Sequence, residues 1–217
     1  MTDAETLDNE ARNSAAAFQA RELLADETTL QLLFTEARTH YGWRDKDVAE
    51  DTLRALYDIA KMGPTSMNQQ PMRVVFVRSD EAKDRLEPAL FEGNRPKMRG
   101  APVTAIIAHD LNFWEELPNV FPPNPDAQDI FKNNATAAQI NAFRNGTLQG
   151  AYFMLAARAV GLDVGGMSGF DNGKLDEEFF HGTSLKSNFL VNLGYADTSK
   201  IFRRLPRLDY DTVCETI

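Results

Sequence analysis

The sequence predicts one domain of the α/β or α+β class, and three observations support this. Segments typical of strands alternate with segments typical of helices along the chain. The 217 residues are 43% hydrophobic and 10% aromatic, which is enough to fill one core. No linker rich in Ser, Gly or Pro divides the chain, and no long period repeats. We therefore expect a disordered tail over residues 1–13 and a single domain over 14–217.

Several segments have the composition or the apolar spacing of helices. In one of them Leu53, Leu56, Tyr57 and Ala60 recur at helical spacing, and Gly63 suits the residue that ends the helix. Ser79 is a candidate N-cap for the next helix. The approximate helical segments are 14–24, 28–36, 47–63, 79–90, 135–160 and 174–182.

Three segments are typical of strands: 72–78, 102–110 and 188–196. The second is almost entirely apolar, so burial on both faces is expected. Residues 161–171 are expected to be extended or loop. Residues 111–130 contain four prolines and three large aromatic residues. This pattern predicts an exposed excursion that serves as a lid or a partner surface.

Charge and cysteine content exclude several classes of function. The chain carries 23 basic and 32 acidic side chains, a net charge of −9, which disfavours binding to nucleic acid or anionic membranes. Cys214 is the only cysteine, so neither an intrachain disulfide nor a cysteine-rich zinc site is possible. The acidic, polar N-terminus is unlike a signal peptide, and no apolar run could span a bilayer. A cytoplasmic protein is expected.

The common catalytic and nucleotide-binding motifs are missing from the sequence. No glycine-rich loop follows the first predicted strand, and residues 161–169 lack the spacing of a dinucleotide-binding loop. His40, His109 and His181 stand far apart and predict no metal site. No GxSxG elbow occurs. Nothing indicates a protein nucleophile, and no catalytic side chain can be named.

A bound phosphate would therefore have to be held by side chains. Arginine suits this role because its planar guanidinium makes paired, charge-assisted hydrogen bonds. Two segments offer it: Arg38 is followed by Thr39, and the tail carries Arg203, Arg204 and Arg207. A plain alternative is that these arginines only balance acidic surfaces.

The turn before the first predicted strand is dense in uncharged residues that can form hydrogen bonds. Local capping of a turn needs one or two such residues, whereas this turn has six in one connection. A neutral set of this kind suits the edge of a flat ring that is rich in N–H and C=O groups. The six are Pro64, Thr65, Ser66, Asn68, Gln69 and Gln70.

Together these segments resemble the FMN-dependent nitroreductase family, and most closely its subgroup containing the malonic semialdehyde reductase of the Rut pathway of pyrimidine degradation. The similarity covers nearly the whole chain. It rests on residues 33–43, 61–71, 87–94, 101–110, 150–153, 161–171 and 185–208. The resemblance implies an α+β fold in three α/β/α layers with a mixed central sheet. It also implies an entwined homodimer with FMN at the subunit interface.

The resemblance also implies which residues hold the cofactor. The phosphate would be held by residues 33–43, called the first segment below, and by the arginines of the C-terminal tail. In the first segment, Tyr41 stands where the family often has a second basic residue. The turn would bind the flavin ring, and residues 167–169 would lie near its N5, through backbone groups. The implied cofactor-binding residues are Arg38, Thr39, His40, Thr65, Ser66, Asn68, Met167, Ser168, Gly169, Arg204 and Arg207.

The implied activity is that of an FMN-dependent NAD(P)H oxidoreductase. Hydride would pass from NADH or NADPH through flavin N5 to malonic semialdehyde, giving 3-hydroxypropanoate. A broad nitroreductase or quinone reductase is the alternative on the same scaffold, and a flavin-binding protein without turnover is a second one. A substrate carboxylate would need a cation near the ring, for which Arg73 and Lys97 are candidates.

Overall fold

The computed structural model describes residues 3–21 and 23–217. Its contacts divide the chain into two compact units, and the boundary in the sequence falls between Ala37 and Arg38. The first unit contains the helix α1 (Asp3–Gln19), the helix α2 (Glu27–Leu30) and the π-helix η1 (Gln31–Thr35). The expected single domain over 14–217 stays a prediction.

The N-terminal helix differs from the sequence prediction. α1 covers most of the segment that was expected to be a disordered tail. Its side chains from Ala4 to Gln19 are all exposed, so the helix rests on local propensity, with Ala, Glu, Leu and Arg as good helix formers. α2 begins with a side-chain cap, because Asp26 Oδ1 accepts from Thr29 N at 2.7 Å.

The second unit is built on a four-stranded sheet in the order β1-β2-β4-β3. The strands are β1 (Met72–Val77), β2 (Val103–Asp110), β3 (Asp163–Met167) and β4 (Leu185–Gly194). All pairings between them are antiparallel, so the expected mixed sheet is wrong. β3 was expected only as extended or loop structure, and it pairs along β4 from Asp163↔Gly194 to Met167↔Leu190.

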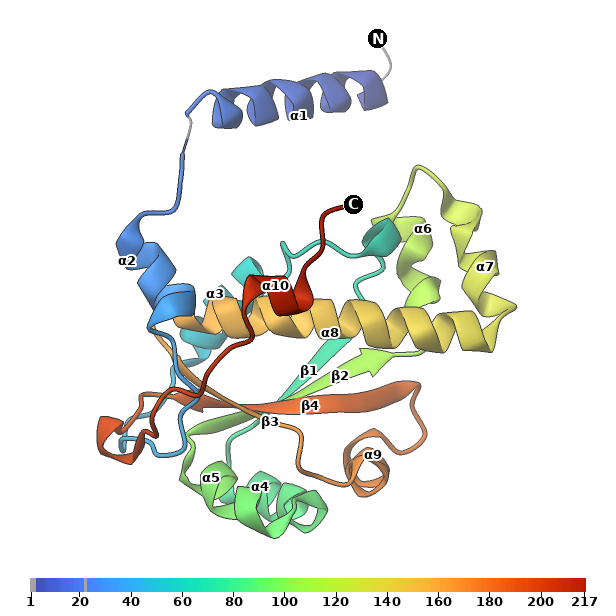
Figure 1. Cartoon of the computed structure of the whole chain (residues 1–217). Helices are drawn as coiled ribbons and strands as arrows, with labels where there is room; N and C mark the ends of the chain where they lie inside the picture. Colours follow the sequence, from blue (N-terminus) through green and yellow to red (C-terminus); the bar gives the residue numbers. More distant parts are fainter. Residues whose placement is uncertain (1–2, 22) are drawn as a thin grey trace. The chain divides into compact units, whose positions relative to one another are not determined.

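Helices cover both faces of the sheet, which gives the expected three layers (Figure 1). On one face Leu53 and Leu56 of α3 (Glu50–Ala60) and Phe153 of α8 (Ala135–Ala159) pack on the sheet. On the other, α4 (Asp80–Leu86), α5 (Arg95–Gly100) and α9 (Asn172–Phe180) contribute Leu86, Met98 and Leu175. β2 is buried on both faces as predicted, since Val103, Ala105 and Ile107 face one core while Ile106 and Ala108 face the other.

Shorter elements complete the unit. The remaining α-helices are α6 (Leu117–Val120), α7 (Gln128–Lys132) and α10 (Tyr210–Val213). The 3₁₀ turns are η2 (Ser66–Asn68), η3 (Glu87–Ala89), η4 (Glu92–Asn94), η5 (Phe113–Glu116), η6 (Pro125–Ala127) and η7 (Thr198–Lys200). No helix of the described residues is both long and apolar enough to cross a membrane.

The excursion after β2 is folded, so the prediction of an exposed segment is wrong for most of its apolar side chains. η5, α6, η6 and α7 enclose a small third core, in which the rings of Phe113 and Phe131 lie 5.0 Å apart. Leu117 and Ala127 are also buried there, against Ala138 and Ala142 of α8. Aromatic residues spaced irregularly between prolines gave no periodic signal of this packing.

Gly63 has a different role from the predicted one. α3 ends at Ala60, and Gly63 does not have the positive φ of a left-handed helix cap. A Cβ at Gly63 would lie 2.6 Å from Cγ of Tyr152 on α8. The glycine is therefore required by close packing against a ring.

Candidate functional site

The first predicted phosphate-binding segment lies along β3. Thr39 forms an isolated parallel bridge with Val164, and His40 N donates to Val164 O at 3.0 Å. Gly165 makes this approach possible, because a Cβ there would lie 2.5 Å from the carbonyl oxygen of His40. The backbone of this segment therefore packs directly against the backbone of β3.

His40 is a buried anchor of this segment. Its Nε2 lies 3.3 Å from Asp163 Oδ1, and Asp163 Oδ2 accepts from Ala196 N at 2.7 Å. Burial lowers the pKa of His40, which Asp163 partly opposes, while Arg38 and Arg158 lower it further. The neutral imidazole is therefore favoured. The side chain of His40 is occupied by Asp163, which leaves the exposed Thr39 and the half-buried Arg38 as the groups of the segment able to meet a ligand.

Arg38 connects this segment to the C-terminal tail. Its Nη2 donates to the carbonyl oxygen of Phe202, and the ring of Tyr41 contacts the ring of Phe202 edge-on at 5.3 Å. Arg204 follows two residues later. Arg207 Nη1 donates to Leu205 O at 2.9 Å and Pro206 O at 3.3 Å, within the tail itself. The structure thus brings Arg38 to the start of the tail, whereas the guanidinium of Arg207 bonds to the backbone of the tail itself.

The loop after β3 borders an open hollow. Met167 is buried, whereas Ser168 is exposed. The hollow measures about 310 Å³ and is lined by Thr147, Ala151, Met154, Gly166, Met167, Ser168 and Phe189. Gly169 O accepts from Asn94 Nδ2 at 3.0 Å and from Phe91 N at 3.1 Å. Two of the three residues predicted near the ring line this hollow: Met167, the last residue of β3, and Ser168, which follows it.

Asn94 and Lys97 are further candidate site residues. Asn94 was not predicted, and Lys97 was named only as a candidate for binding a substrate carboxylate. Lys97 Nζ donates to Asn94 Oδ1 at 3.0 Å and lies 4.9 Å from the ring centroid of Tyr41. A cation therefore stands beside Tyr41, at the place where the family often has a basic residue in the first segment. The only sequence signal is an Asn and a Lys three positions apart at a helix start, which is too common to identify a site.

The polar turn has an unusual backbone. Met67 and Asn68 have φ of 51° and Gln70 has φ of 44°. Residues other than glycine rarely adopt such left-handed values, because Cβ crowds the following carbonyl. Surrounding contacts must therefore hold this turn in place.

Three amide side chains of α8 supply part of that hold. Asn145 Oδ1 accepts from Ser66 N, Asn145 Nδ2 donates to Gln69 Oε1, and Gln149 Oε1 accepts from Met72 N, each at 2.9 Å. Asn141 Oδ1 accepts from Gln69 Nε2 at 3.4 Å. Gln69 and Asn145 are each only 1% exposed. The turn is thus bonded directly to one side of α8.

The burial of Gln69 corrects the interpretation that all six polar residues face a ligand. Gln69 points to α8, and the Thr65 hydroxyl accepts from Gln70 N at 3.2 Å. Ser66 and Asn68 are exposed, and Asn68 Nδ2 donates to Val120 O at 2.7 Å. Ser66 and Asn68 are therefore the hydrogen-bonding side chains of the turn that are exposed to a ligand.

Comparison with known proteins places the chain in a family. The model of the nitroreductase family matches residues 35–195, most of the chain. The chain belongs to the nitroreductase family. Membership identifies this protein as an oxidoreductase, and the match begins within η1, so α1 and α2 lie outside it.

Solved structures share the fold of this nitroreductase-family chain. A nitroreductase-like protein of Bacillus subtilis is 17% identical with a TM-score of 0.79, and the match covers 88% of this chain and 100% of that one. A nitroreductase-like protein of Exiguobacterium sibiricum in complex with FMN is 18% identical over 90% and 99% of the two chains, with a TM-score of 0.79. A Staphylococcus epidermidis protein named as an NAD(P)H:FMN oxidoreductase is 20% identical over 90% and 98%, with a TM-score of 0.77.

In this nitroreductase-family chain, α8 separates the predicted site residues into two groups. Asn145 contacts the turn, whereas Thr147 lines the hollow beside Ser168, and two residues along a helix differ by about 200° in direction. β1, which follows the turn, and β3 are at opposite edges of the sheet, about 14 Å apart. Arg38, Thr39 and the loop after β3 form one group, and Thr65, Ser66 and Asn68 form the other.

Proposed function

We propose that this oxidoreductase uses FMN to carry hydride from NADH or NADPH to malonic semialdehyde, giving 3-hydroxypropanoate. The placement of the first group supports this most. Thr39 pairs with Val164, and Met167 lies three residues further along β3, about 10 Å away. A phosphate near Arg38 and a ring near the loop after β3 suit an elongated cofactor that has a charged end and a flat end.

The donor groups fit FMN. Arg38 and Thr39 offer a guanidinium and a hydroxyl for the phosphate, with Arg204 and Arg207 of the tail as further cations. When bound, FMN supplies hydride transfer at its N5. Lys97 and Asn94 place a cation and an amide beside the loop, where they would stabilise negative charge on a ligand. An FMN complex of a protein with this fold is consistent with the proposal.

We also propose that the protein works as a homodimer with its sites at the interface. The turn and the loop after β3 lie on different sides of α8, so a second copy is needed to bring one chain's turn to the other chain's loop. The exposed face of α8 carries four large apolar side chains, Ile140, Phe143, Leu148 and Tyr152, each 41–53% exposed. The tail also exposes Phe202, Leu205 and Leu208. Such surfaces are typical of protein interfaces.

The choice of substrate class rests on the resemblance and on the available cations. Arg73 pairs with Asp110 at 2.9 Å, so it is not free to bind a substrate carboxylate. Lys97 lies beside the loop and is the better placed of the two candidates. A broad nitroreductase or quinone reductase stays the alternative, because the open hollow itself is mostly apolar in its lining residues.

The test begins with the visible spectrum of the purified protein. FMN-dependent turnover requires yellow protein that NADH or NADPH bleaches, and colourless protein that FMN cannot reconstitute would overturn the proposal. Rates with malonic semialdehyde, a nitroaromatic and a quinone then decide the acceptor. Faster turnover of the nitroaromatic or the quinone would favour the alternative, and yellow protein that neither nucleotide bleaches would indicate a flavin binder without turnover.

Arg207→Ala is expected to weaken FMN binding at least about tenfold while the protein stays folded, because one charge-assisted contact to phosphate is lost. An FMN titration followed by fluorescence measures this. Arg203→Ala is the matched control, since Arg203 is also exposed and makes no polar contact within the described residues. Equal affinity of both variants would contradict a phosphate role for Arg207.

Asn68→Ala is expected to bind FMN and to change its midpoint potential, because an amide beside the ring stabilises one redox state more than the other. Spectroelectrochemistry measures the potential. Asn119→Ala is the control, an exposed asparagine of α6 whose side chain donates to Glu116 Oε2 at 3.0 Å. A wild-type potential in Asn68→Ala would argue against contact with the ring.

A further inference from the structure

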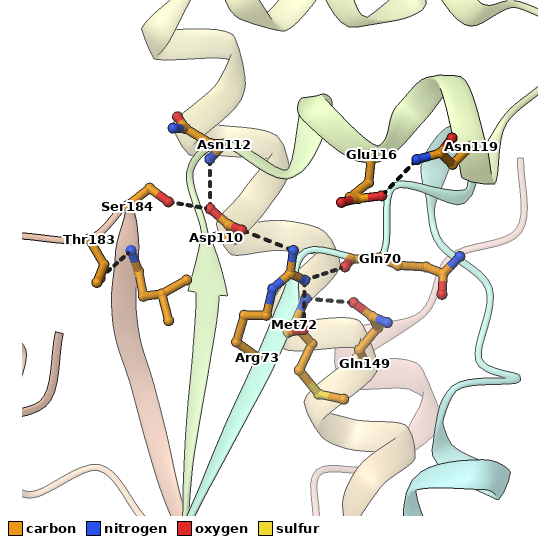
Figure 2. Close-up of polar contacts among 11 residues, drawn as sticks. Gln70, Met72, Arg73, Asp110, Asn112, Glu116, Asn119, Gln149, Thr183 and Ser184 are labelled. Atoms are coloured by element: carbon orange, nitrogen blue, oxygen red, sulfur yellow. Dashed lines mark hydrogen bonds and ion pairs between the residues drawn. The ribbon is translucent and has the colours of Figure 1, made fainter.

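Arg73, the second residue of β1, folds back onto the turn that precedes it. Its Nη1 donates to the carbonyl oxygens of Gln70 and Met72, each at 3.0 Å. Figure 2 shows the guanidinium between these carbonyls and Asp110. The side chain is 35% exposed, so part of this contact is shielded from solvent.

The carbonyl that Arg73 holds belongs to a residue in a strained conformation. Gln70 has φ of 44°, and its N–H is already bonded to the Thr65 hydroxyl at 3.2 Å. Both polar groups of the Gln70 backbone are thus held from outside the residue. Asn68, another left-handed residue, lies two positions before it, so the direction of the exposed Asn68 amide depends on this fixed end of the turn.

Asp110 in turn holds Arg73. Its Oδ2 pairs with Arg73 Nη2 at 2.9 Å, while its Oδ1 accepts from Ser184 Oγ at 2.6 Å and from Asn112 N at 2.9 Å (Figure 2). The side chain is only 15% exposed. Asp110 N also donates to Pro71 O at 2.9 Å. The carboxylate therefore has a fixed position, set by the end of β2 and by the residue before β4.

From this chain of contacts we infer that Arg73 is a positioning residue for the cofactor, with Asp110 as its partner. The inference rests on the proposed function, in which the turn binds the flavin ring. Arg73 does not touch the ligand itself. It fixes the backbone of Gln70 and so the place of Asn68 and Ser66, since a binding group must be held close to its productive geometry to act.

The test uses the full-length protein loaded with FMN. Arg73→Met removes both the ion pair and the two carbonyl contacts, and Arg73→Lys keeps a charge that can meet Asp110 but cannot form the planar fork. We expect Arg73→Met to raise the FMN dissociation constant about tenfold and to move the midpoint potential. Arg73→Lys is expected to restore neither value fully.

Arg85→Met is the matched control. Arg85 pairs with Glu178 at 2.6 Å and also contacts the Glu178 carbonyl at 3.4 Å, between α4 and α9 on the other side of the sheet. The inference would be overturned if both Arg73 variants had the FMN affinity and the midpoint potential of the wild type. A lower melting temperature alone, as expected for Arg85→Met, would not support it. If Arg73→Met fails to fold, Arg73→Lys decides alone. Wild-type protein that binds no FMN would instead overturn the proposed function.

Discussion

Gly165→Ala is expected to lower the free energy of unfolding by about 3 kcal/mol, near the upper end for added volume in a packed region. The new methyl group would lie 2.5 Å from the carbonyl oxygen of His40, and that backbone is tied to β3 by the bond from His40 N to Val164 O. Trp43 closes the same space, with Cζ2 at 3.3 Å. Either β3 or the first segment must shift, so FMN affinity should fall as well.

Urea denaturation of the FMN-free protein measures this effect, and Gly166→Ala is the control. A Cβ at Gly166 meets only Met154 Sδ, at an ordinary 3.7 Å, and the position is exposed. We expect that variant to remain within about 0.5 kcal/mol of the wild type, as for most surface substitutions. Similar losses in the two variants would show that the first segment does not lie on Gly165.

Asn145→Leu is expected to cost about 3 kcal/mol, because it leaves buried polar groups of the turn without partners. Ser66 N loses its acceptor and Gln69 Oε1 loses its donor, and Gln69 is 1% exposed, so water cannot replace the lost bond. For a unit of this size the melting temperature should fall by roughly 6–12 °C. The turn should also lose its left-handed backbone, and with it the affinity for FMN.

Calorimetry with and without FMN separates these two effects. Asn188→Ala is the control, since the Asn188 side chain donates to Thr147 Oγ1 at 2.8 Å and is only partly buried. We expect a change below about 0.5 kcal/mol there. An Asn145→Leu protein as stable as the wild type would mean that the turn does not depend on α8.

Elements with the composition or the apolar spacing of a helix or strand were predicted well from the sequence. The helices α3, α8 and α9 and the strands β1, β2 and β4 lie close to the expected segments. β3 was not predicted as a strand, because two of its five residues are glycines and no alternation is visible. The excursion was misjudged because its burial arises from contacts between its own short helices and α8, which no local pattern records.

The sequence predicted which types of residue form the candidate site. It predicted less well how their side chains are arranged. Arg38, Ser66, Asn68 and Ser168 are accessible, as a ligand site requires. The inward direction of Gln69 depends on amides of α8 that lie more than seventy positions away. The candidate role of Lys97 likewise depends on its contact with the ring of Tyr41, which lies in a distant segment of the sequence.

The small core of the segment after β2 has a consequence for how relatives of this protein can diverge. Its rings pack on one another and on the start of α8, so the two main cores do not depend on them. The same segment touches the turn through Met67 and through the bond from Asn68 to Val120. Its loops can therefore change during evolution with little harm to folding, and each change reshapes the surroundings of Asn68, so that the range of accepted molecules evolves separately from the scaffold.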